Sequence, residues 1–325
     1  MLQYALILIQ GDFMQCRRYM RYMKNIIKMP SRVKAIYETQ DKLLHSLISA
    51  QMVAHIDKLD VVLELAKSFS KAEIIRNKEK ALAYFSLINP VRSLSFNLVR
   101  IGGQTDGGYV LLCPPPPALK SNSSPKVVSL GVSESSPFDL EMADMGYEVL
   151  EYDASIESSP YPKHPNIKFF KKFVGAAESH NTITLEQIIK DNHFDENAHN
   201  ILQCDIEDVE WEVLEGIDIA LLAQYFPQIL FEFHNCYPDD EALTQRRLSI
   251  LEKINKYFVP IHTHFNNNAE LLFAENLFFC PVIEVSYLRK DLMPNDAKPI
   301  VGSATLPGLD YPNTQNYPDI PVIFV

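Results

Sequence analysis

The densest group of acidic residues in the chain follows directly on a short apolar stretch, Asn200 to Cys204. Five carboxylates stand within the next eight residues: Asp205, Glu207, Asp208, Glu210 and Glu212. If the apolar stretch is a strand of an open α/β sheet, Asp205 lies at its carboxyl end, where such sheets bind their ligands. Glu210 and Glu212 have a simpler interpretation as solvated acids at a helix N-terminus, where they favour the helix dipole. Asp205 is therefore the first candidate for a chemical role.

A second polar pair, Glu232 and His234, lies at the end of another mostly apolar stretch that begins at Ile229. Glu232 and His234 alternate with aromatic residues, so they share one face at the end of the expected strand. A carboxylate and an imidazole that converge on one crevice can act as acid and base or as metal ligands, although a lone histidine can also be structural. We predict His234 as the general base, Asp205 as its competitor and Glu232 beside them. The alternative is a Mg²⁺ ion on Asp205, Glu207 and Glu232, which would lower the pKa of an acceptor hydroxyl.

The first buried strand of the expected sheet, Lys126 to Leu130, is followed directly by a glycine. The next strand, Glu148 to Tyr152, has acidic residues at its end. Gly131 would let the backbone turn sharply under a bound cofactor, and Asp153, with Glu151 as second choice, would bind ribose hydroxyls. The expected cofactor contacts here are Gly131, Ser133, Glu134 and Asp153. The later glycines of a GxGxxG fingerprint are missing, so the close backbone approach that a dinucleotide pyrophosphate needs is not provided. This pattern favours S-adenosylmethionine over NAD.

Alternating strands and helices must position these residues, because after Pro90 short β-like stretches alternate with helical ones, as in an α/β sheet with crossover helices. The expected strands are Lys126 to Leu130, Glu148 to Tyr152, Ile167 to Val174, Asn200 to Cys204, Gln228 to Phe233, Phe258 to His262 and Val282 to Leu288. The expected helices lie near Phe138 to Met145, Thr184 to Asp191, Trp211 to Leu214 and Glu241 to Lys256. His262 and His264 mark one more polar strand end, for which we expect a structural role.

Residues 1–90 have a different pattern. Apolar residues recur at steps of three and four from Asp41 to Phe69 without Gly or Pro, which predicts a long helix. Ser70 to Glu73 has the form of a capping box and predicts a second helix that ends before Pro90. Arg17 to Lys34 carries seven Lys and Arg and no acid; such a helix can lie on an anionic membrane or a partner, or pack on its own domain. We predict a helical region over 1–90, serving as a lid, an adaptor or a homo-oligomer contact, and a second domain over 91–325.

The composition limits the classes of partner and compartment. A formal net charge of -11 gives a surface that repels phosphate backbones, so nucleic acid is not an expected partner. The five cysteines have no CxxC spacing, which argues against a zinc knuckle and against a disulfide framework. The apolar run Tyr4 to Ile9 is far shorter than the roughly 20 residues that span a bilayer and lacks the order of a signal peptide. We expect a cytoplasmic protein.

Taken in order, several segments resemble the FkbM-related methyltransferases, especially the branch shared with methyltransferase-like proteins of animals. The matching segments are Arg100-Ile101-Gly102-Gly103 with Asp106-Gly107-Gly108-Tyr109; Ser129-Leu130-Gly131-Val132 with Pro137-Phe138-Asp139; Tyr152-Asp153-Ala154-Ser155; Asp205 to Glu212; Phe231-Glu232-Phe233-His234; and Glu284-Val285 with Arg289-Lys290. The resemblance runs from about residue 92 to the C-terminus, and the ordered combination is far more specific than any single segment.

The resemblance implies a Rossmann-like class I methyltransferase fold, with a seven-stranded, mostly parallel sheet and helices on both faces. It also implies S-adenosylmethionine as methyl donor and methylation of a hydroxyl on a glycan or small metabolite. The family pattern places the turn with Asp106 and Gly107 beside the cofactor, for which a plain β-turn is the alternative. Where the family has Asp-x-Glu-Gly, this chain has Asp208 instead of the glycine. Aspartate tolerates a positive φ, so the turn can be kept.

Two functions from other classes share parts of this pattern. An NAD-dependent sugar oxidoreductase would use the same sheet and the same ribose acid, but the incomplete glycine fingerprint argues against it. A non-catalytic scaffold could bind a nucleotide without turnover and dimerise through the N-terminal helices. The departure at Asp208 keeps this alternative open.

Overall fold

The computed structural model describes residues 65–116, 119–121, 123–274 and 277–324. The basic segment Arg17 to Lys34, and all but the last five residues of the long helix expected from Asp41 to Phe69, lie outside this part of the chain. No described helix is both long enough and apolar enough to cross a lipid bilayer. A cytoplasmic location stays a prediction.

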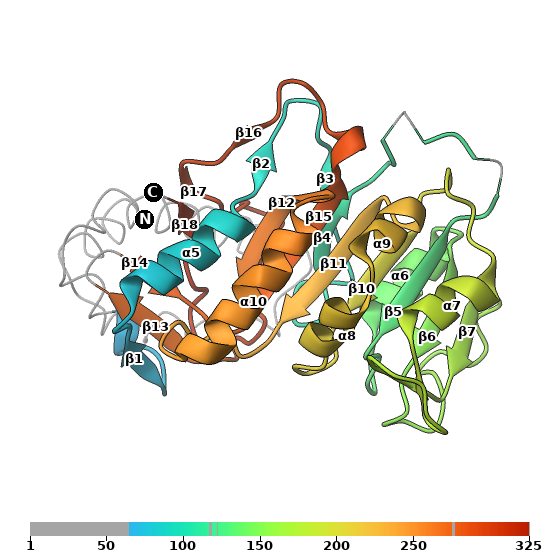
Figure 1. The fold of residues 1–325 in the computed structure, drawn as a ribbon, viewed down its shortest axis with the longest axis horizontal. Helices are drawn as coiled ribbons and strands as arrows, with labels where there is room; N and C mark the ends of the chain where they lie inside the picture. The colour runs from blue at the N-terminus through green and yellow to red at the C-terminus, as the bar shows by residue number, and fades with distance from the viewer. Residues whose placement is uncertain (1–64, 117–118, 122, 275–276, 325) are drawn as a thin grey trace, which may run out of the picture.

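The centre of the described chain is a sheet of seven strands in the order β12-β15-β11-β10-β5-β6-β7 (Figure 1). Their bounds are β5 Lys126–Leu130, β6 Glu148–Tyr152, β7 Ile167–Phe170, β10 Ile201–Cys204, β11 Gln228–Phe233, β12 Phe258–Phe265 and β15 Ile283–Arg289. Only β15 runs antiparallel to its neighbours within this sheet. The expected seven-stranded, mostly parallel, Rossmann-like sheet is confirmed.

The strand order places a topological switch point between β5 and β10. From β5 the chain passes outward through β6 to β7, and then returns to form β10 on the opposite side of β5. Two neighbouring loops therefore leave the sheet in opposite directions at this point, which opens the crevice where open α/β sheets bind ligands. Gly131 and Asp205 are the residues that follow the two strands.

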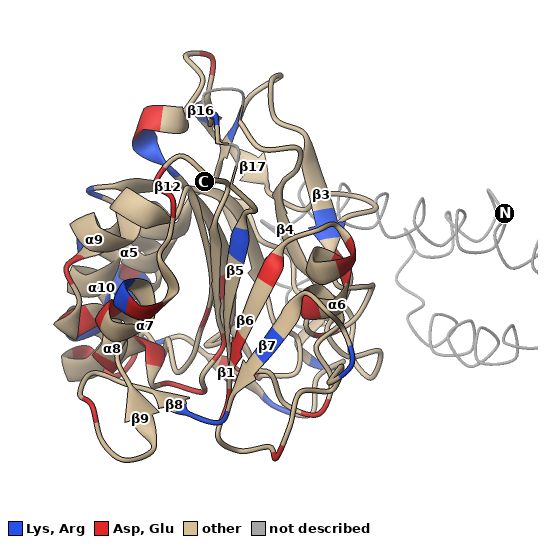
Figure 2. Ribbon diagram, turned by 90° about the vertical axis from the view of Figure 1, so that its right-hand side faces the viewer, with Lys and Arg blue, Asp and Glu red and all other residues tan. Residues whose placement is uncertain are grey.

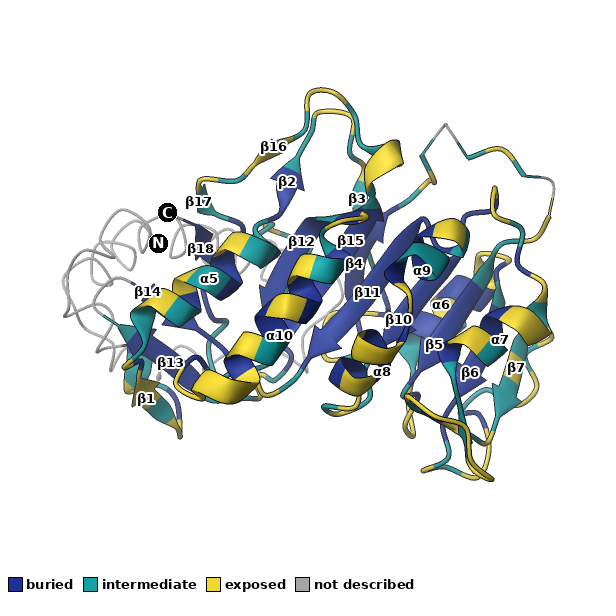
Figure 3. Cartoon of the chain, viewed as in Figure 1, coloured by how far each residue is buried: buried dark blue, intermediate teal, exposed yellow. Residues whose placement is uncertain are grey.

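Helices cover both faces of the sheet, unequally (Figure 2). One face carries α5 Lys78–Ile88, α7 Leu185–Asn192, α8 Glu210–Gly216, α9 Ile219–Tyr225 and α10 Glu241–Ile254. The other face carries α6 Pro137–Asp144 and the hairpin of β3 Leu98–Ile101 and β4 Tyr109–Leu112. Along β5, Val128 and Leu130 join the larger core and Val127 joins the smaller core under α6. Both faces of the central strands are thus covered, and Figure 3 shows these strands as buried.

The segment before residue 90 differs from its sequence prediction. Ala72–Ile74 forms strand β1, which pairs in parallel with β13 Leu271–Ala274, and β13 pairs with β14 Leu277–Phe279. The capping box predicted at Ser70 to Glu73 is therefore wrong, because the edge of β13 supplies the main-chain partners that a helix would otherwise provide. The helix begins at Lys78 instead, where the Asn77 side chain caps the Lys80 amide.

Helix α5 ends at Ile88, before Pro90, as predicted. Its buried residues, among them Tyr84 and Phe85, belong to the same core as the main sheet, and the helix packs against α10. The described part of the N-terminal region, residues 65–90, is thus joined to the sheet. The division at residue 90 stays a prediction for residues 1–64, which lie outside the described chain.

The strand predicted from Ile167 to Val174 and helix α9 also differ from the prediction. The single strand expected from Ile167 to Val174 is two strands, because the chain turns at Lys172, whose amide donates to the Phe170 carbonyl at 2.7 Å. The second piece, β8 Phe173–Val174, pairs with β9 Thr182–Ile183 outside the main sheet. Helix α9 was not predicted. The other helices lie within two residues of their predicted ends or extend beyond them.

Candidate active site at the carboxyl edge of the sheet

A row of mostly polar residues crosses one face of the sheet at the carboxyl ends of its parallel strands. The register pairs Ser129 with Gln203, so the residues two positions on, Gly131 and Asp205, also lie side by side. Glu232 is paired with Glu284, and Glu284 with His264. In sheet order the row is Asp153, Gly131, Asp205, Glu232, Glu284 and His264. The predicted convergence of Asp205 and Glu232 on one face is therefore present.

Gly131 brings the ends of β5 and β10 together. Its φ is +82°, in the left-handed region that favours glycine, and a Cβ at this position would lie 1.7 Å from the Asp205 carbonyl oxygen. The Asp205 amide in turn donates to the Leu130 carbonyl at 2.9 Å. A glycine is thus required here by the neighbouring main chain, and it sets the position of Asp205.

Asp153 holds the loop that follows Gly131. Its Oδ2 accepts from the main-chain amides of Val132 and Ser133 at 3.0 and 2.9 Å. Its Oδ1 accepts from the amide and the hydroxyl of Ser155 at 2.7 and 2.6 Å. Burial acts to raise the pKa of Asp153, but these hydrogen bonds outweigh it and lower the pKa. The carboxylate therefore positions the loop, and a ribose hydroxyl would have to share or displace one of these four bonds.

The other predicted cofactor residues lie around the same loop. Ser133, with a φ of +58°, and Glu134 are exposed at its tip. Gly107 belongs to the β3–β4 hairpin and lies against the Pro137 ring at the start of α6, so the hairpin loop borders the crevice. Asp106, from the same loop, reaches across to the tail residue Asn313, whose Nδ2 donates to it at 2.9 Å. Asp106 is thus placed on the Glu232 side of the row.

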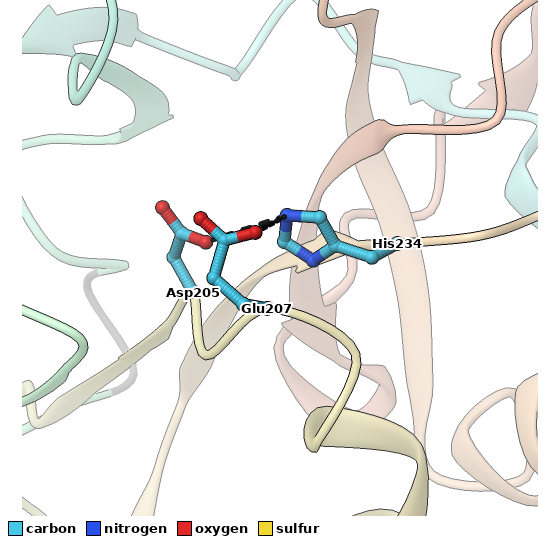
Figure 4. Close-up of side chains that lie close together, drawn as sticks. All are labelled: Asp205, Glu207 and His234. Atoms are coloured by element: carbon cyan, nitrogen blue, oxygen red, sulfur yellow. Dashed lines mark ion pairs between the residues drawn. The ribbon is translucent and has the colours of Figure 1, made fainter. Parts of the chain in front are cut away.

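His234 lies at the centre of a group of carboxylates (Figure 4). Its Nδ1 is 3.2 Å from Oε1 of the fully buried Glu210, which also accepts from the His234 amide at 2.7 Å. Its Nε2 faces Glu207 Oε2 at 3.5 Å, Asp205 Oδ1 at 3.7 Å and Glu232 Oε1 at 3.8 Å. Because Glu210 binds Nδ1, the free nitrogen Nε2 is the one that faces the crevice.

The electrostatic surroundings of this group favour a positive charge at its centre. Burial raises the pKa of Asp205 to about 7, and neighbouring carboxylates add to the shift while His234 opposes it. Burial, followed by the charge of Asp205, raises the pKa of Glu232 well above its ordinary value. Burial acts to lower the pKa of His234, but the hydrogen bond and charge of Glu210 and the other carboxylates outweigh it and raise the pKa. Both acids are thus driven toward the neutral form and the imidazole toward the cation.

Asp208, which stands where the resembled sequences have a glycine, has a left-handed backbone conformation. Its φ is +82°, so the expectation that aspartate can adopt the turn is confirmed. Its carboxylate also binds Arg247, which is 4% exposed, at 3.0 Å. Arg247 donates as well to the Asn235 carbonyl and lies over the Trp211 ring at 5.5 Å. The substitution therefore ties the loop after β10 to the loop after β11.

Glu210 and Glu284 are site residues to which the sequence analysis gave no chemical role. A solvated helix N-terminus was the simpler of two interpretations of Glu210 and Glu212. Glu210 is fully buried, which excludes that interpretation for it, whereas Glu212 is exposed. The helical spacing could have shown this, because Glu210, Val213 and Leu214 recur at three and four residues on the buried face of α8. Glu284 is 4% exposed, and its place beside Glu232 depends on the antiparallel register of β15, which the sequence does not reveal.

A second group of oxygens lies next to the first. Asp106, Glu232 and Glu284 have carboxylate oxygens within 4.8 Å of one another. Asn266 donates to Glu232 at 2.7 Å, and Asn313 donates to Glu284 at 2.6 Å. These two side-chain amides thus provide hydrogen-bond donors for two of the three carboxylates.

The polar strand end at His262 and His264 anchors the C-terminal tail, in agreement with the predicted structural role. His262 Nε2 is 2.7 Å from Asp310 Oδ1. His264 lies between Glu284 and Asp319, at 3.1 Å from each. Both histidines are buried and both aspartates belong to the tail, so these pairs hold the tail across the polar face.

No protein-family model matches the chain. The human protein named probable methyltransferase-like protein 24 is 24% identical to it over 176 residues, which cover 49% of this chain and 48% of the human protein. The rat protein of the same name is 24% identical over 172 residues, which cover 47% of each. The chain therefore spans about half the length of the curated relatives it matches. The narrower resemblance to FkbM-related enzymes stays a prediction.

Two solved structures that align with this chain are also named as methyltransferases. A putative rRNA-methylase from Clostridium thermocellum aligns with a TM-score of 0.32 and 10% identity, over 66% of this chain and 97% of that one. A predicted O-methyltransferase from Agrobacterium tumefaciens aligns with a TM-score of 0.30 and 12% identity, over 53% of this chain and 77% of that one.

Proposed function

We propose that this chain is an S-adenosylmethionine-dependent methyltransferase that methylates a hydroxyl group of a glycan or a small metabolite. The observation that carries the proposal is the switch point between β5 and β10, where the Gly131 loop and Asp205 meet at the ligand-binding edge of a seven-stranded sheet. The sequence similarity to methyltransferase-like proteins supports the same activity.

The residues of this crevice fit the donor better than they fit a dinucleotide. The main-chain amides of Val132 and Ser133, at the turn where a pyrophosphate would bind, already donate to Asp153. Asp205 Oδ1, in contrast, is buried without a hydrogen-bond partner, so it is a polar atom that a bound group would satisfy. In this proposal Ser133 and Glu134 contact the donor, and Asp153 acts by holding their loop.

The charge of the crevice also bears on the acceptor. Carboxylates line it on the side of Glu232 and Glu284, where they can accept hydrogen bonds from the hydroxyls of a neutral acceptor. A phosphorylated acceptor would be repelled by the same groups. The acidic lining therefore supports a polyhydroxylated or other neutral acceptor rather than a nucleic acid.

S-adenosylmethionine, when bound, supplies a methyl group on a positively charged sulfonium. Transfer is an in-line displacement, so the chain mainly aligns the reactants, excludes water and removes the acceptor proton. We propose that the acceptor hydroxyl lies against Asp205, Glu232 and His234 and that Asp205 takes up its proton. The pKa of Asp205 is about 7, so part of this carboxylate is ionised at neutral pH, whereas the raised pKa of His234 argues against the imidazole as the base. The carboxylates also favour the cationic donor over the neutral thioether product, which promotes product release.

Calorimetric titration of the full chain with S-adenosylhomocysteine and, separately, with NADH tests the proposal. We expect saturable binding of S-adenosylhomocysteine and none of NADH. Binding of NADH alone would replace the methyltransferase with an oxidoreductase. Binding of neither ligand would leave a non-catalytic scaffold and overturn the proposed activity.

A further inference from the structure

We infer that Asp205, Glu207 and His234 form a binding site for one divalent first-row transition-metal ion. Each of the three residues offers one ligand atom, and these atoms lie within 4.8 Å of one another. Figure 4 shows the two carboxylates, from the loop after β10, facing the imidazole at the end of β11. The ligand set includes a nitrogen and thus differs from the all-oxygen set of Asp205, Glu207 and Glu232 that the sequence suggested for Mg²⁺.

The distances are those of ligands around an ion rather than of hydrogen bonds. His234 Nε2 lies 3.5 Å from Glu207 Oε2 and 3.7 Å from Asp205 Oδ1, at or beyond the limit for an N–H···O bond. Ligand atoms about 2.1 Å from a common tetrahedral ion are about 3.4 Å apart. A small cation between the three atoms can therefore approach bonding distance to each of them with minor side-chain movement.

Two further observations point to a ligand at this place. Glu210 accepts a hydrogen bond from His234 Nδ1, and a carboxylate behind the imidazole is the arrangement that fixes the tautomer and ring of metal-binding histidines. Glu210 is fully buried, so it holds the ring from inside the protein. Asp205 Oδ1 is buried and accepts no hydrogen bond in the described chain. An ion between Asp205 and His234 would supply the missing partner.

The mixed ligand set selects the kind of ion. Imidazole suits Mn²⁺, Fe²⁺ or Zn²⁺ together with carboxylates, whereas Mg²⁺ is held mainly by oxygens and water. The side chain of Glu207 is 87% exposed, so solvent or an acceptor hydroxyl can reach the remaining coordination positions. For the proposed methyltransferase the ion would lower the pKa of that hydroxyl, and the proton would pass to a neighbouring carboxylate. Ion binding itself does not depend on the proposed activity.

The test is a titration of the full chain, first stripped with EDTA and desalted, with MnCl₂, in which electron paramagnetic resonance measures free Mn²⁺. We expect one saturable ion per chain. Glu207→Gln removes a ligand whose side chain is exposed, so the fold is kept, and affinity should fall at least about tenfold. In Glu210→Gln the affinity should fall by about 10- to 100-fold, because the imidazole of His234 loses the carboxylate that orients it. Glu212→Gln, an exposed acid on the same helix, is the matched control and should bind as the wild type does.

Three results would overturn the inference: no saturable binding, unchanged affinity in Glu207→Gln, or an equal loss in Glu212→Gln, which would indicate an unspecific acidic surface. Titration of the EDTA-treated protein with S-adenosylhomocysteine tests the cofactor site separately. A chain that binds S-adenosylhomocysteine but not Mn²⁺ would refute the metal site and leave the proposed methyltransferase standing. A chain that binds Mn²⁺ but not S-adenosylhomocysteine would support the metal site and refute the proposed methyltransferase.

Discussion

The replacement of Asp153 by alanine tests the central interpretation of the cofactor loop. Asp153 is 7% exposed, and its carboxylate accepts main-chain hydrogen bonds from Val132, Ser133 and Ser155. The amide of Val132 matters most, because this residue is 2% exposed and water cannot readily replace the lost partner. An orphaned buried donor costs about 1 to 3 kcal/mol, and lost bonds to a charged acceptor add to it. We expect the free energy of unfolding to fall by about 2 to 4 kcal/mol.

The same change should weaken binding at the proposed cofactor site, because the loop that carries Ser133 and Glu134 loses its anchor. A distortion that costs about 1.4 kcal/mol in binding raises the dissociation constant tenfold, so we expect at least that loss for S-adenosylhomocysteine. Urea unfolding followed by circular dichroism measures the first effect, and calorimetry on the folded variant measures the second. Glu157→Ala is the control: this exposed acid lies in the same loop after β6 and pairs only at the surface with Lys171.

The two measurements can refute the reasoning separately. An Asp153→Ala protein with the urea midpoint of the wild type would show that the hydrogen bonds of Asp153 do not stabilise the loops that they join. A protein that is destabilised but binds S-adenosylhomocysteine with unchanged affinity would show that this loop does not form the cofactor site. An equal effect in Glu157→Ala would remove the special role of Asp153.

Two further predictions concern the same end of the sheet. Gly131→Ala places a Cβ 1.7 Å from the Asp205 carbonyl oxygen in a left-handed backbone and should lower the free energy of unfolding by about 3 kcal/mol or more. Gly146→Ala, with a φ of +94° and open space around the Cβ, should lower it by about 1 to 2 kcal/mol. Equal thermal midpoints for the two variants would contradict this. Burial, followed by the charge of Asp139, raises the pKa of Glu151 to about 7, so its contribution to stability is full below its ordinary value of 4.5 and is lost as the pH rises through 7. Glu151→Gln should therefore reduce the loss of stability between pH 5 and pH 8 by about 2 to 3 kcal/mol, and urea unfolding curves with the same pH dependence as the wild type would refute it.

The sequence by itself determined the central strands and the order in which their polar ends appear. Val127 to Leu130 and Ile201 to Cys204 are mostly apolar runs followed by Gly131 and Asp205, and such runs indicate burial on both faces without knowledge of the partner strand. The alternation that placed Glu232 and His234 on one face is equally local, because successive side chains of a strand point to opposite sides. For this reason the fold could be predicted, together with the edge of the sheet at which Asp205, Glu232 and His234 come together.

Only the tertiary structure decided which partners these residues contact and which of them are buried. Asp153 had the right place for a ribose ligand, but one of its carboxylate oxygens binds the loop after β5 and the other binds Ser155 in its own loop. The sequence left open whether Glu210 is a solvated acid at a helix start, and the structure buries it behind His234, because α8 packs its first turn against the end of β11. Ser70 to Glu73 had the form of a helix start, but Ala72 to Ile74 form strand β1 because they pair with the distant strand β13. In each case the deciding partner is far away in the sequence, so local pattern and propensity could not reveal it.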